Sequence, residues 1–191
     1  MGVPVKPFGV AKARLGPVLD ARSRSVVGRA VAARTAAAAE RSGCTVAVVT
    51  GDPGVARWAR RLGYEVVDET AGGPGLDGAA RSVALEAARR GMRWAIVHAD
   101  LPLATSEDLS AVFVTAPAIA PSRDGGTNVI VGAGTGFPFS YGPGSFHRHL
   151  AAAPGARVVT RPGLALDLDT PGDLARARRA AAGAWLSALD I

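Results

Sequence analysis

The sequence has almost none of the residues on which disulfides and zinc cages depend. Cys44 is the single cysteine among 191 residues, so an internal disulfide and any cysteine-based zinc cage are excluded. His147 and His149 are two positions apart and would not face one another on a helix, which disfavours a zinc pair. His98, inside an apolar run, is typical of a buried core histidine. The sequence therefore favours neither a disulfide-stabilised nor a zinc-dependent protein.

Long apolar runs are missing as well. No stretch approaches the ~18 residues that span a bilayer, and the opening residues MGVPVKPFGVAK contain no apolar segment typical of a secretory signal. We therefore expect a cytoplasmic protein that does not bind a membrane. With 48% hydrophobic and 20% charged residues, a chain of this length is expected to form a single domain, residues 1–191, with a substantial core.

Aromatic side chains make up only 5% of the sequence, although the chain is basic, with a net charge of +6 and a pI of about 10.6. A base-stacking platform needs more aromatic residues, and the arginines are scattered over helix-like segments. We expect no nucleic-acid partner, and a basic nucleic-acid-binding module is kept as the non-enzymatic alternative. A basic protein also suits small anionic substrates.

Three common catalytic signatures are absent. The chain has no G-x-x-x-x-G-K-[ST] phosphate loop and no G-x-G-x-x-G after its first strand, so P-loop hydrolysis and dinucleotide binding lose their main support. Ser145 is not part of a G-x-S-x-G elbow, which disfavours a serine hydrolase.

What the sequence does contain is an alternation of strand-like and helix-like segments. This order predicts an α/β fold of three layers with a mainly parallel, mixed sheet. Glycines that follow helical segments and prolines that open them mark the boundaries. Strands are expected at 3–6, 45–50, 64–69, 93–100, 116–122, 127–133, 156–160 and 164–169, and helices at 20–42, 53–62, 76–90, 106–113, 145–153 and from 171.

Acidic residues stand at the ends of two of these strands. In GLALDLDTPGDL, residues 163–174, Asp167 and Asp169 would share one face of an extended chain. At ~7 Å they repel by roughly 2.4 kcal/mol at an effective dielectric of 20, so a divalent cation, a basic side chain or water must compensate. Asp100 ends the strand 93–100, and open α/β sheets bind ligands beyond such ends. Together the three acids suit Mg²⁺; singly, Asp100 and Asp169 also suit turn and helix-cap roles.

Basic and glycine-rich loops accompany the acids. Lys6, Lys12 and Arg14 lie in a loop after the first strand, where they could hold a triphosphate or be solvated surface charges. The loops SRDGGTN (122–128) and FSYGPGSFHRH (139–149) allow close backbone approach to an anion, and Thr127 and Ser145 add hydroxyl donors. Ser145 would begin a helix whose N-terminus favours a phosphate, or serve only as its N-cap.

Five motifs, in order, resemble the guanylyltransferases of coenzyme F420 biosynthesis, the CofC/FbiD family. They are VPVKPFGVAKARL, HADLPL, GGTN, YGPGSFHRH and PGLALDLDTPGDL, and they span nearly the whole chain. The resemblance implies a nucleotidyltransferase fold related to the glycosyltransferase-A architecture. It also implies transfer of GMP from GTP to phosphoenolpyruvate, or to 2-phospho-L-lactate or 3-phosphoglycerate, with release of pyrophosphate and with Mg²⁺ as cofactor. A homodimer is the only oligomer that we consider.

The same resemblance implies roles for individual residues. Asp100, Asp167 and Asp169 would bind the metal, Thr127, Gly142 and Ser145 the acceptor acid, and Lys6, Lys12 and Arg14 the nucleotide phosphates, with Lys12 and Asp100 catalytic. Where relatives commonly read G-L-N, this chain has Gly75-Leu76-Asp77, and a carboxylate cannot donate hydrogen bonds, so we do not assign guanine recognition to that loop. The enzymatic alternative is a molybdenum-cofactor or sugar-nucleotide type nucleotidyltransferase, whose G-G-x-S/G-x-R-[LM] loop is absent here.

Overall fold

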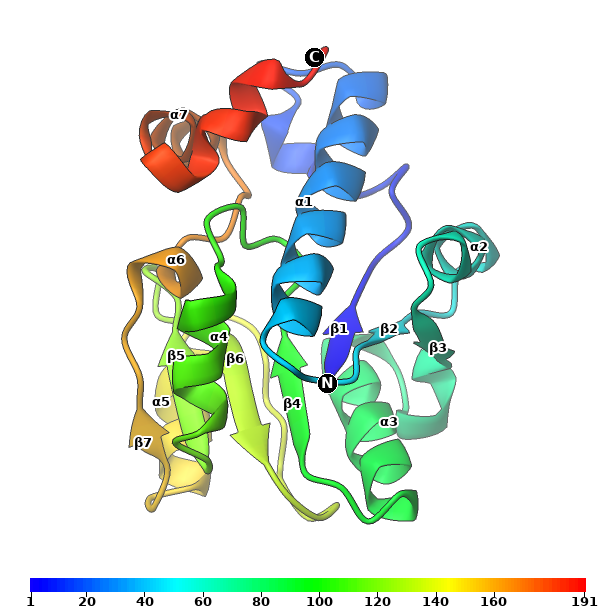
Figure 1. Cartoon of the computed structure of the whole chain (residues 1–191), viewed down its shortest axis with the longest axis vertical. Helices are drawn as coiled ribbons and strands as arrows, with labels where there is room; N and C mark the ends of the chain where they lie inside the picture. Colours follow the sequence, from blue (N-terminus) through cyan, green and yellow to red (C-terminus); the bar gives the residue numbers. More distant parts are fainter.

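Seven short strands form one sheet in the computed structural model, which describes residues 1–191 (Figure 1). Their order across the sheet is β3-β2-β1-β4-β6-β5-β7. Strand β6 runs antiparallel to both of its neighbours, and the other pairs are parallel. The expectation of a mainly parallel mixed sheet is confirmed. The strands are β1 (Gly2–Pro4), β2 (Ala47–Val49), β3 (Glu65–Val67), β4 (Trp94–Val97), β5 (Ala118–Pro121), β6 (Thr127–Gly132) and β7 (Arg157–Val158).

The helices begin where the sequence places capping residues. The Asp20 carboxylate accepts a hydrogen bond from the Ser23 N–H at the start of the longest helix, and capping boxes built on Thr105 and Thr170 open two others. None of the helices is both long enough and apolar enough to cross a membrane. The α-helices are α1 (Ala21–Arg41), α2 (Pro53–Arg61), α3 (Gly75–Arg89), α4 (Ser106–Phe113), α5 (Ser145–Ala152), α6 (Pro162–Ala165) and α7 (Pro171–Arg179), and the 3₁₀ helices are η1 (Ala13–Leu15), η2 (Glu69–Gly72) and η3 (Ala181–Ala188).

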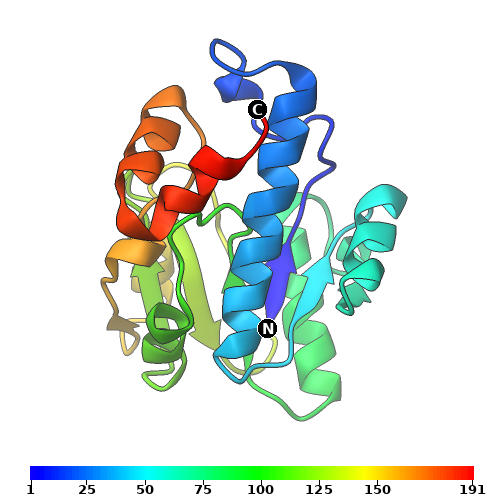
Figure 2. The same ribbon diagram turned by 45° about the horizontal axis from the view of Figure 1, so that its top comes forward.

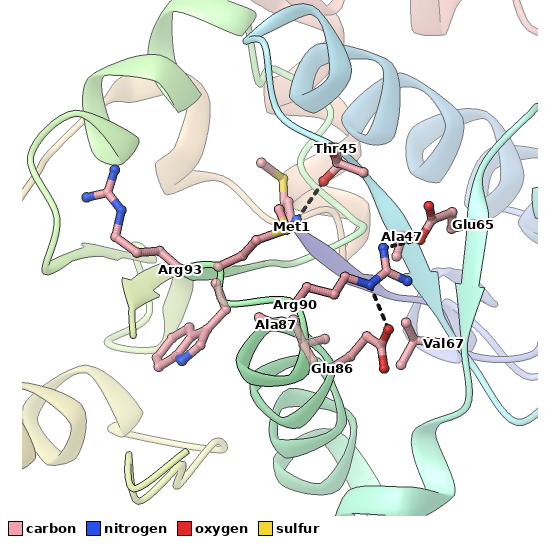
Figure 3. Close-up of a pocket in the computed structure, with 12 residues that line it drawn as sticks. Met1, Thr45, Ala47, Glu65, Val67, Glu86, Ala87, Arg90 and Arg93 are labelled. Atoms are coloured by element: carbon pink, nitrogen blue, oxygen red, sulfur yellow. Dashed lines mark hydrogen bonds and ion pairs between the residues drawn. The ribbon is translucent and has the colours of Figure 1, made fainter. Parts of the chain in front are cut away.

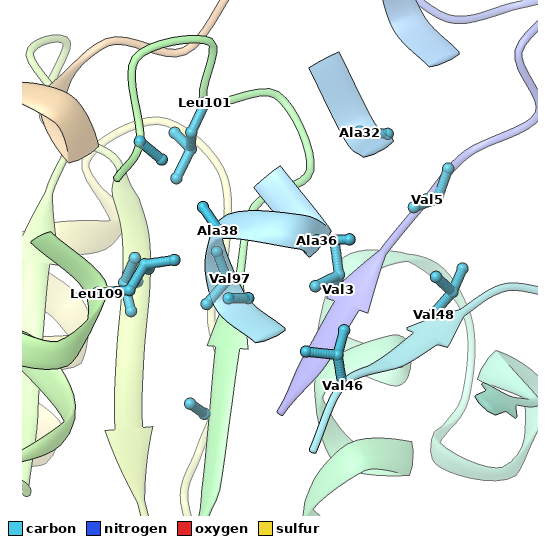
Figure 4. Close-up of a cluster of buried hydrophobic side chains, with 14 of the residues drawn as sticks. Val3, Val5, Ala32, Ala36, Ala38, Val46, Val48, Val97, Leu101 and Leu109 are labelled. Carbon is cyan, nitrogen blue, oxygen red and sulfur yellow. The ribbon is translucent and has the colours of Figure 1, made fainter. Parts of the chain in front are cut away.

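Two apolar layers hold the helices on the sheet. Helices α1 and α4 cover one face, which Figure 1 shows in front and Figure 2 shows from a second angle, whereas α3 packs on the opposite face. Figure 4 shows how alternate strand residues such as Val3, Val48 and Val97 meet the alanines of α1 in the first layer. Trp94, Ile96 and Ile130 point to the second layer. This alternation of side chains through the sheet produces the three-layer architecture.

A third cluster lies beyond the sheet and joins the ends of the chain. The first turns of α1, helix α7 and η3 bury leucines and valines against one another there. Leu166 and Leu168 belong to this cluster and are buried. The segment between α6 and α7 is therefore held by this packing without forming a strand of the sheet.

The expectation of a strand over 164–169 is wrong. Residues Pro162–Ala165 form the short helix α6, and residues 166–169 are extended without joining the sheet. Pro162 opens the helix, and Gly163 sits so close to α4 that an added Cβ would lie 2.1 Å from the Asp108 carboxylate. The alternation of buried leucines and open acids survives in residues 166–169, because an extended segment has the same two-residue period whether or not it pairs.

Candidate active site

A cleft of about 500 Å³ opens at the carboxyl ends of β1 and β4. It lies where open α/β sheets bind their ligands. The first strand and its loop line one side, the η2–α3 connection another, and the segments after β4 and α6 a third. Its lining includes Lys6, Phe8, Val10, Lys12, Glu69, Gly75, Leu76, His98, Asp100, Asp167 and Asp169.

One backbone hydrogen bond brings the two acidic segments together. The Leu168 N–H donates to the Asp100 carbonyl at 2.9 Å, so the residues on both sides of Leu168 lie beside the end of β4. The Thr35 hydroxyl of α1 fixes the next carbonyl, that of Leu101, at 3.2 Å. The predicted meeting of Asp100 with Asp167 and Asp169 at one cleft is therefore present in the structure.

Lys12 stands between two of the three acids. Its Nζ lies 2.7 Å from Asp100 Oδ2 and 2.9 Å from Asp169 Oδ1, and its side chain is only 9% exposed. Burial by itself would lower the pKa of Lys12, but Asp100 and Asp169 outweigh burial and raise the pKa above its usual value. The residue has φ of 59°, a left-handed conformation that costs a non-glycine residue on the order of 1 kcal/mol. Lys12 thus supplies the basic side chain that compensates Asp169, although its own backbone conformation is unfavourable.

Asp167 has no such partner. It forms no ion pair, and burial, followed by the charge of Asp100, raises the pKa of Asp167 to about 6. Asp100 differs, because burial would raise its pKa but Lys12 outweighs burial and lowers it. Even so, Asp100 Oδ1 is buried without a hydrogen-bond partner. The site therefore contains one carboxylate without an ion pair, that of Asp167, and one buried carboxylate oxygen without a hydrogen bond, Asp100 Oδ1.

These donors fit a magnesium ion. No three His, Cys, Asp or Glu side chains are arranged as a complete metal cage. Mg²⁺ rarely uses one, because it is usually held by one or two carboxylates together with water and substrate phosphates. The unpaired Asp167 carboxylate and the partnerless oxygen of Asp100 are hard oxygen ligands of this kind.

The other predicted nucleotide-binding residues are placed unequally. Lys6 is exposed and lines the cleft, whereas Arg14 is exposed on η1 and lies outside the cleft lining. His98, which the sequence suggested was a core residue, also lines the cleft. Its Nε2 is buried without a hydrogen-bond partner. In the sequence, only the position of His98 two residues before Asp100 could have indicated that it lies at the cleft.

The three residues predicted to hold the acceptor come together outside the cleft lining. Ser145 Oγ lies 3.5 Å from Thr127 Oγ1, and the Ser145 N–H donates to the Gly142 carbonyl at 3.0 Å. None of the three belongs to the cleft lining, and Thr127 and Ser145 are each 1% exposed. His149 joins them, with Nδ1 3.0 Å from Thr127 Oγ1. The sequence contained a signal for this contact, since Ser145 and His149 are four residues apart and share one helix face.

Asp77 has a structural role in this part of the molecule. Its Oδ1 accepts a hydrogen bond from the Tyr141 N–H at 2.7 Å, which ties the start of α3 to the 139–144 loop. Its neighbours Gly75 and Leu76 line the cleft instead.

A second pocket lies at the opposite edge of the sheet, near the amino ends of the strands (Figure 3). Its volume is about 40 Å³. Arg90 is already paired with Glu65 at 2.9 Å and Glu86 at 2.7 Å, and the Met1 amino group donates to the Thr45 carbonyl at 2.6 Å. Both acidic residues of this pocket are therefore paired with Arg90, whereas Asp167 in the cleft has no ion pair.

Comparison with known proteins agrees with this geometry. A crystal structure from Desulfovibrio desulfuricans G20, assigned as a nucleotide-diphospho-sugar transferase, superposes with a TM-score of 0.73 at 17% identity, covering 98% of this chain and 93% of that one. It supports the nucleotidyltransferase type of fold.

Two sequence relatives are much closer. The phosphoenolpyruvate guanylyltransferase of Rubrobacter xylanophilus is 39% identical over 91% of this chain and 90% of its own, and that of Geodermatophilus obscurus is 36% identical over 98% and 91%. The profile of the family described as "Guanylyl transferase CofC like" matches residues 1–176. Since this profile covers most of the chain and both relatives are more than 30% identical over at least nine-tenths of it, the chain belongs to the CofC family.

Proposed function

We propose that this protein transfers the GMP unit of GTP to the phosphate of phosphoenolpyruvate and releases pyrophosphate, a step in coenzyme F420 biosynthesis. Membership of the CofC family and the names of the two relatives support this substrate pair. The observation that carries the proposal is the position of Lys12 between Asp100 and Asp169, with Asp167 beside them at the cleft.

The reaction needs charge compensation more than acid–base catalysis. A phosphate oxygen of the acceptor attacks the α-phosphorus of GTP, a new oxygen–phosphorus bond forms, and the bond from the α-phosphorus to the bridging oxygen breaks as pyrophosphate leaves. The attacking oxygen is already anionic, so no residue has to remove a proton. Repulsion between the two anions is the main obstacle, and positioning with charge stabilisation overcomes it.

The residues of the cleft suit that task. Lys12 is held charged by its acidic neighbours, and Lys6 adds a second ammonium at the rim. Asp100, Asp167 and Asp169 are the residues that would hold Mg²⁺. When bound, this ion would neutralise phosphate charge and so lower the cost of bringing the two substrates together. Thr127, Gly142 and Ser145 are the proposed binding residues for the acceptor acid.

The test is pyrophosphate release from purified protein. GTP and Mg²⁺ are supplied with phosphoenolpyruvate, 2-phospho-L-lactate or 3-phosphoglycerate in separate reactions, and ATP, CTP and UTP replace GTP in parallel. Release is expected with GTP and phosphoenolpyruvate, and it should be lost in Asp167→Asn but kept in the matched control Asp190→Asn, which changes an exposed acid near the C-terminus. No release with any acceptor would refute the proposal.

A further inference from the structure

His149 is fully buried on α5, beside Thr127, and no step of the proposed reaction uses it. Its side chain is 0% exposed. The ring is packed by Tyr141, edge to face at 4.8 Å between centroids, and by Phe137 at 5.7 Å. This packing fixes the orientation of the imidazole. Each of its two nitrogens then has one hydrogen-bond partner.

Those partners determine the tautomer of the ring. The Ser140 N–H donates to Nε2 at 2.9 Å, so Nε2 carries a lone pair and the proton of the neutral ring is on Nδ1. Burial lowers the pKa of His149 to about 4, so the ring is neutral at physiological pH. Nδ1–H then donates to Thr127 Oγ1, 3.0 Å away.

The tautomer decides what Thr127 can offer to an anion. Because Thr127 Oγ1 accepts from His149, the hydroxyl proton of Thr127 is not used on the ring and is free to be donated elsewhere. In the opposite tautomer, Thr127 would donate to Nδ1 and turn a lone pair toward any ligand. Anions are bound by donors, so only the observed arrangement suits an anionic group.

We propose that His149 is a positioning residue for the acceptor site: its Nδ1–H holds Thr127 as a hydrogen-bond donor, beside Ser145, for an anionic group of the acceptor acid. The inference rests on the proposed function, because it assigns the acceptor acid to Thr127 and Ser145. Both residues are 1% exposed, so the acceptor reaches their hydroxyls only when the segments that cover them shift. The competing explanation is that His149 merely ties the loop to α5 through Ser140.

Two substitutions separate these explanations, because each keeps one of the two hydrogen bonds. The Asn amide nitrogen replaces Nδ1 and can still donate to Thr127, whereas the Gln amide oxygen replaces Nε2 and can still accept from Ser140. We expect His149→Gln to raise the KM for the acceptor about tenfold, the size of one hydrogen bond to a charged group, with the KM for GTP unchanged. His149→Asn should recover most of that loss, and His147→Gln on the exposed face serves as the matched control.

A loss that is larger in His149→Asn than in His149→Gln, or equal changes in both substrates' KM values, would overturn the inference. So would a full additional effect of His149→Gln in a Thr127→Val background, where the hydroxyl that it positions is gone. Thermal unfolding of each variant verifies that it is folded.

Nitrogen-15 NMR of the imidazole provides a measurement that does not depend on activity. In the wild-type protein, with His149→Gln used for assignment, Nδ1 should be protonated and Nε2 unprotonated at neutral pH. A ring protonated on Nε2 refutes the inference even if the enzyme is active. A wild-type protein that releases no pyrophosphate refutes the proposed function instead, and the NMR result still decides the tautomer.

Discussion

Replacing Asp167 by Asn should make the metal-free protein more stable while abolishing its turnover. The folded state raises the pKa of Asp167 from its usual 3.8 to about 6, so at pH 7 folding requires a carboxylate to stay ionised where it is disfavoured. The difference corresponds to about 3 kcal/mol. Because the Asp167 side chain is only partly buried, solvent screening reduces this electrostatic cost to about 1–2 kcal/mol. Each kcal/mol gained in the variant should raise its Tm by about 2–4 °C for a chain of this size.

The pH dependence has a definite sign. A carboxyl whose pKa is raised on folding destabilises the folded state fully above pH 6, less between pH 6 and pH 3.8, and not at all below 3.8. The gain from Asp167→Asn should therefore be complete at pH 7, roughly half as large near pH 5, and only about a fifth as large near pH 4. Urea unfolding in EDTA at the three pH values measures it.

Asp169→Asn is the matched comparison, since Asp169 is two residues away and accepts a hydrogen bond from Lys12 at 2.9 Å. Its side chain is 42% exposed, so removing this pair should destabilise the protein by no more than about 1 kcal/mol. Opposite signs for the two variants are expected. If Asp167→Asn is equally stable or less stable than the wild type at pH 7, the carboxylate is not under electrostatic strain and our account of the site is wrong.

Three further variants test the contacts around the cleft. Lys12→Met removes the partner of Asp100 Oδ2, while Oδ1 of the same carboxylate already lacks one, and should lower the free energy of unfolding by about 2–3 kcal/mol and abolish pyrophosphate release; equal stability in urea would contradict the bridging role. Asp77→Ala frees the Tyr141 N–H and should raise the acceptor KM several-fold with about 1 kcal/mol loss of stability, measured by steady-state kinetics and thermal unfolding, whereas an unchanged acceptor KM would mean that the loop needs no tie to α3. Thr170→Ala removes the capping box of α7 and should cost about 1 kcal/mol, a loss that calorimetry would detect and that a Tm within 1 °C of wild type would refute.

Most of the fold could be predicted from local patterns. Helix α1 begins after Asp20 and ends before Gly43, and α7 begins at Pro171 after its Thr170 cap, as the capping residues predict. The antiparallel direction of β6 and the short helix α6 were not predicted. Both depend on what lies next to them in space, because direction and pairing have no signature in the alternation of a single segment.

The candidate site could be predicted in part. Asp100, Asp167 and Asp169 were expected at one cleft and are found there. Lys12 was expected near the phosphates, but its place between two of the acids was not. Arg14 was grouped with it, yet η1 directs that stretch so that Arg14 lies outside the cleft lining. A loop sequence indicates which charges are available and not which of them turn inward.

The sequence by itself determined the kinds of residue at the site and the local conformation that presents them: extended acids beside buried leucines, helices with their caps, and glycine-rich loops. It could do so because the periods of strand and helix and the chemistry of caps act over a few residues. Only the tertiary structure decided that Lys12 would meet Asp100, 88 residues away, and Asp169, 157 residues away, or that His149 would set the proton of Thr127. Contacts over such separations arise when the packed core brings segments together, and no local pattern encodes them.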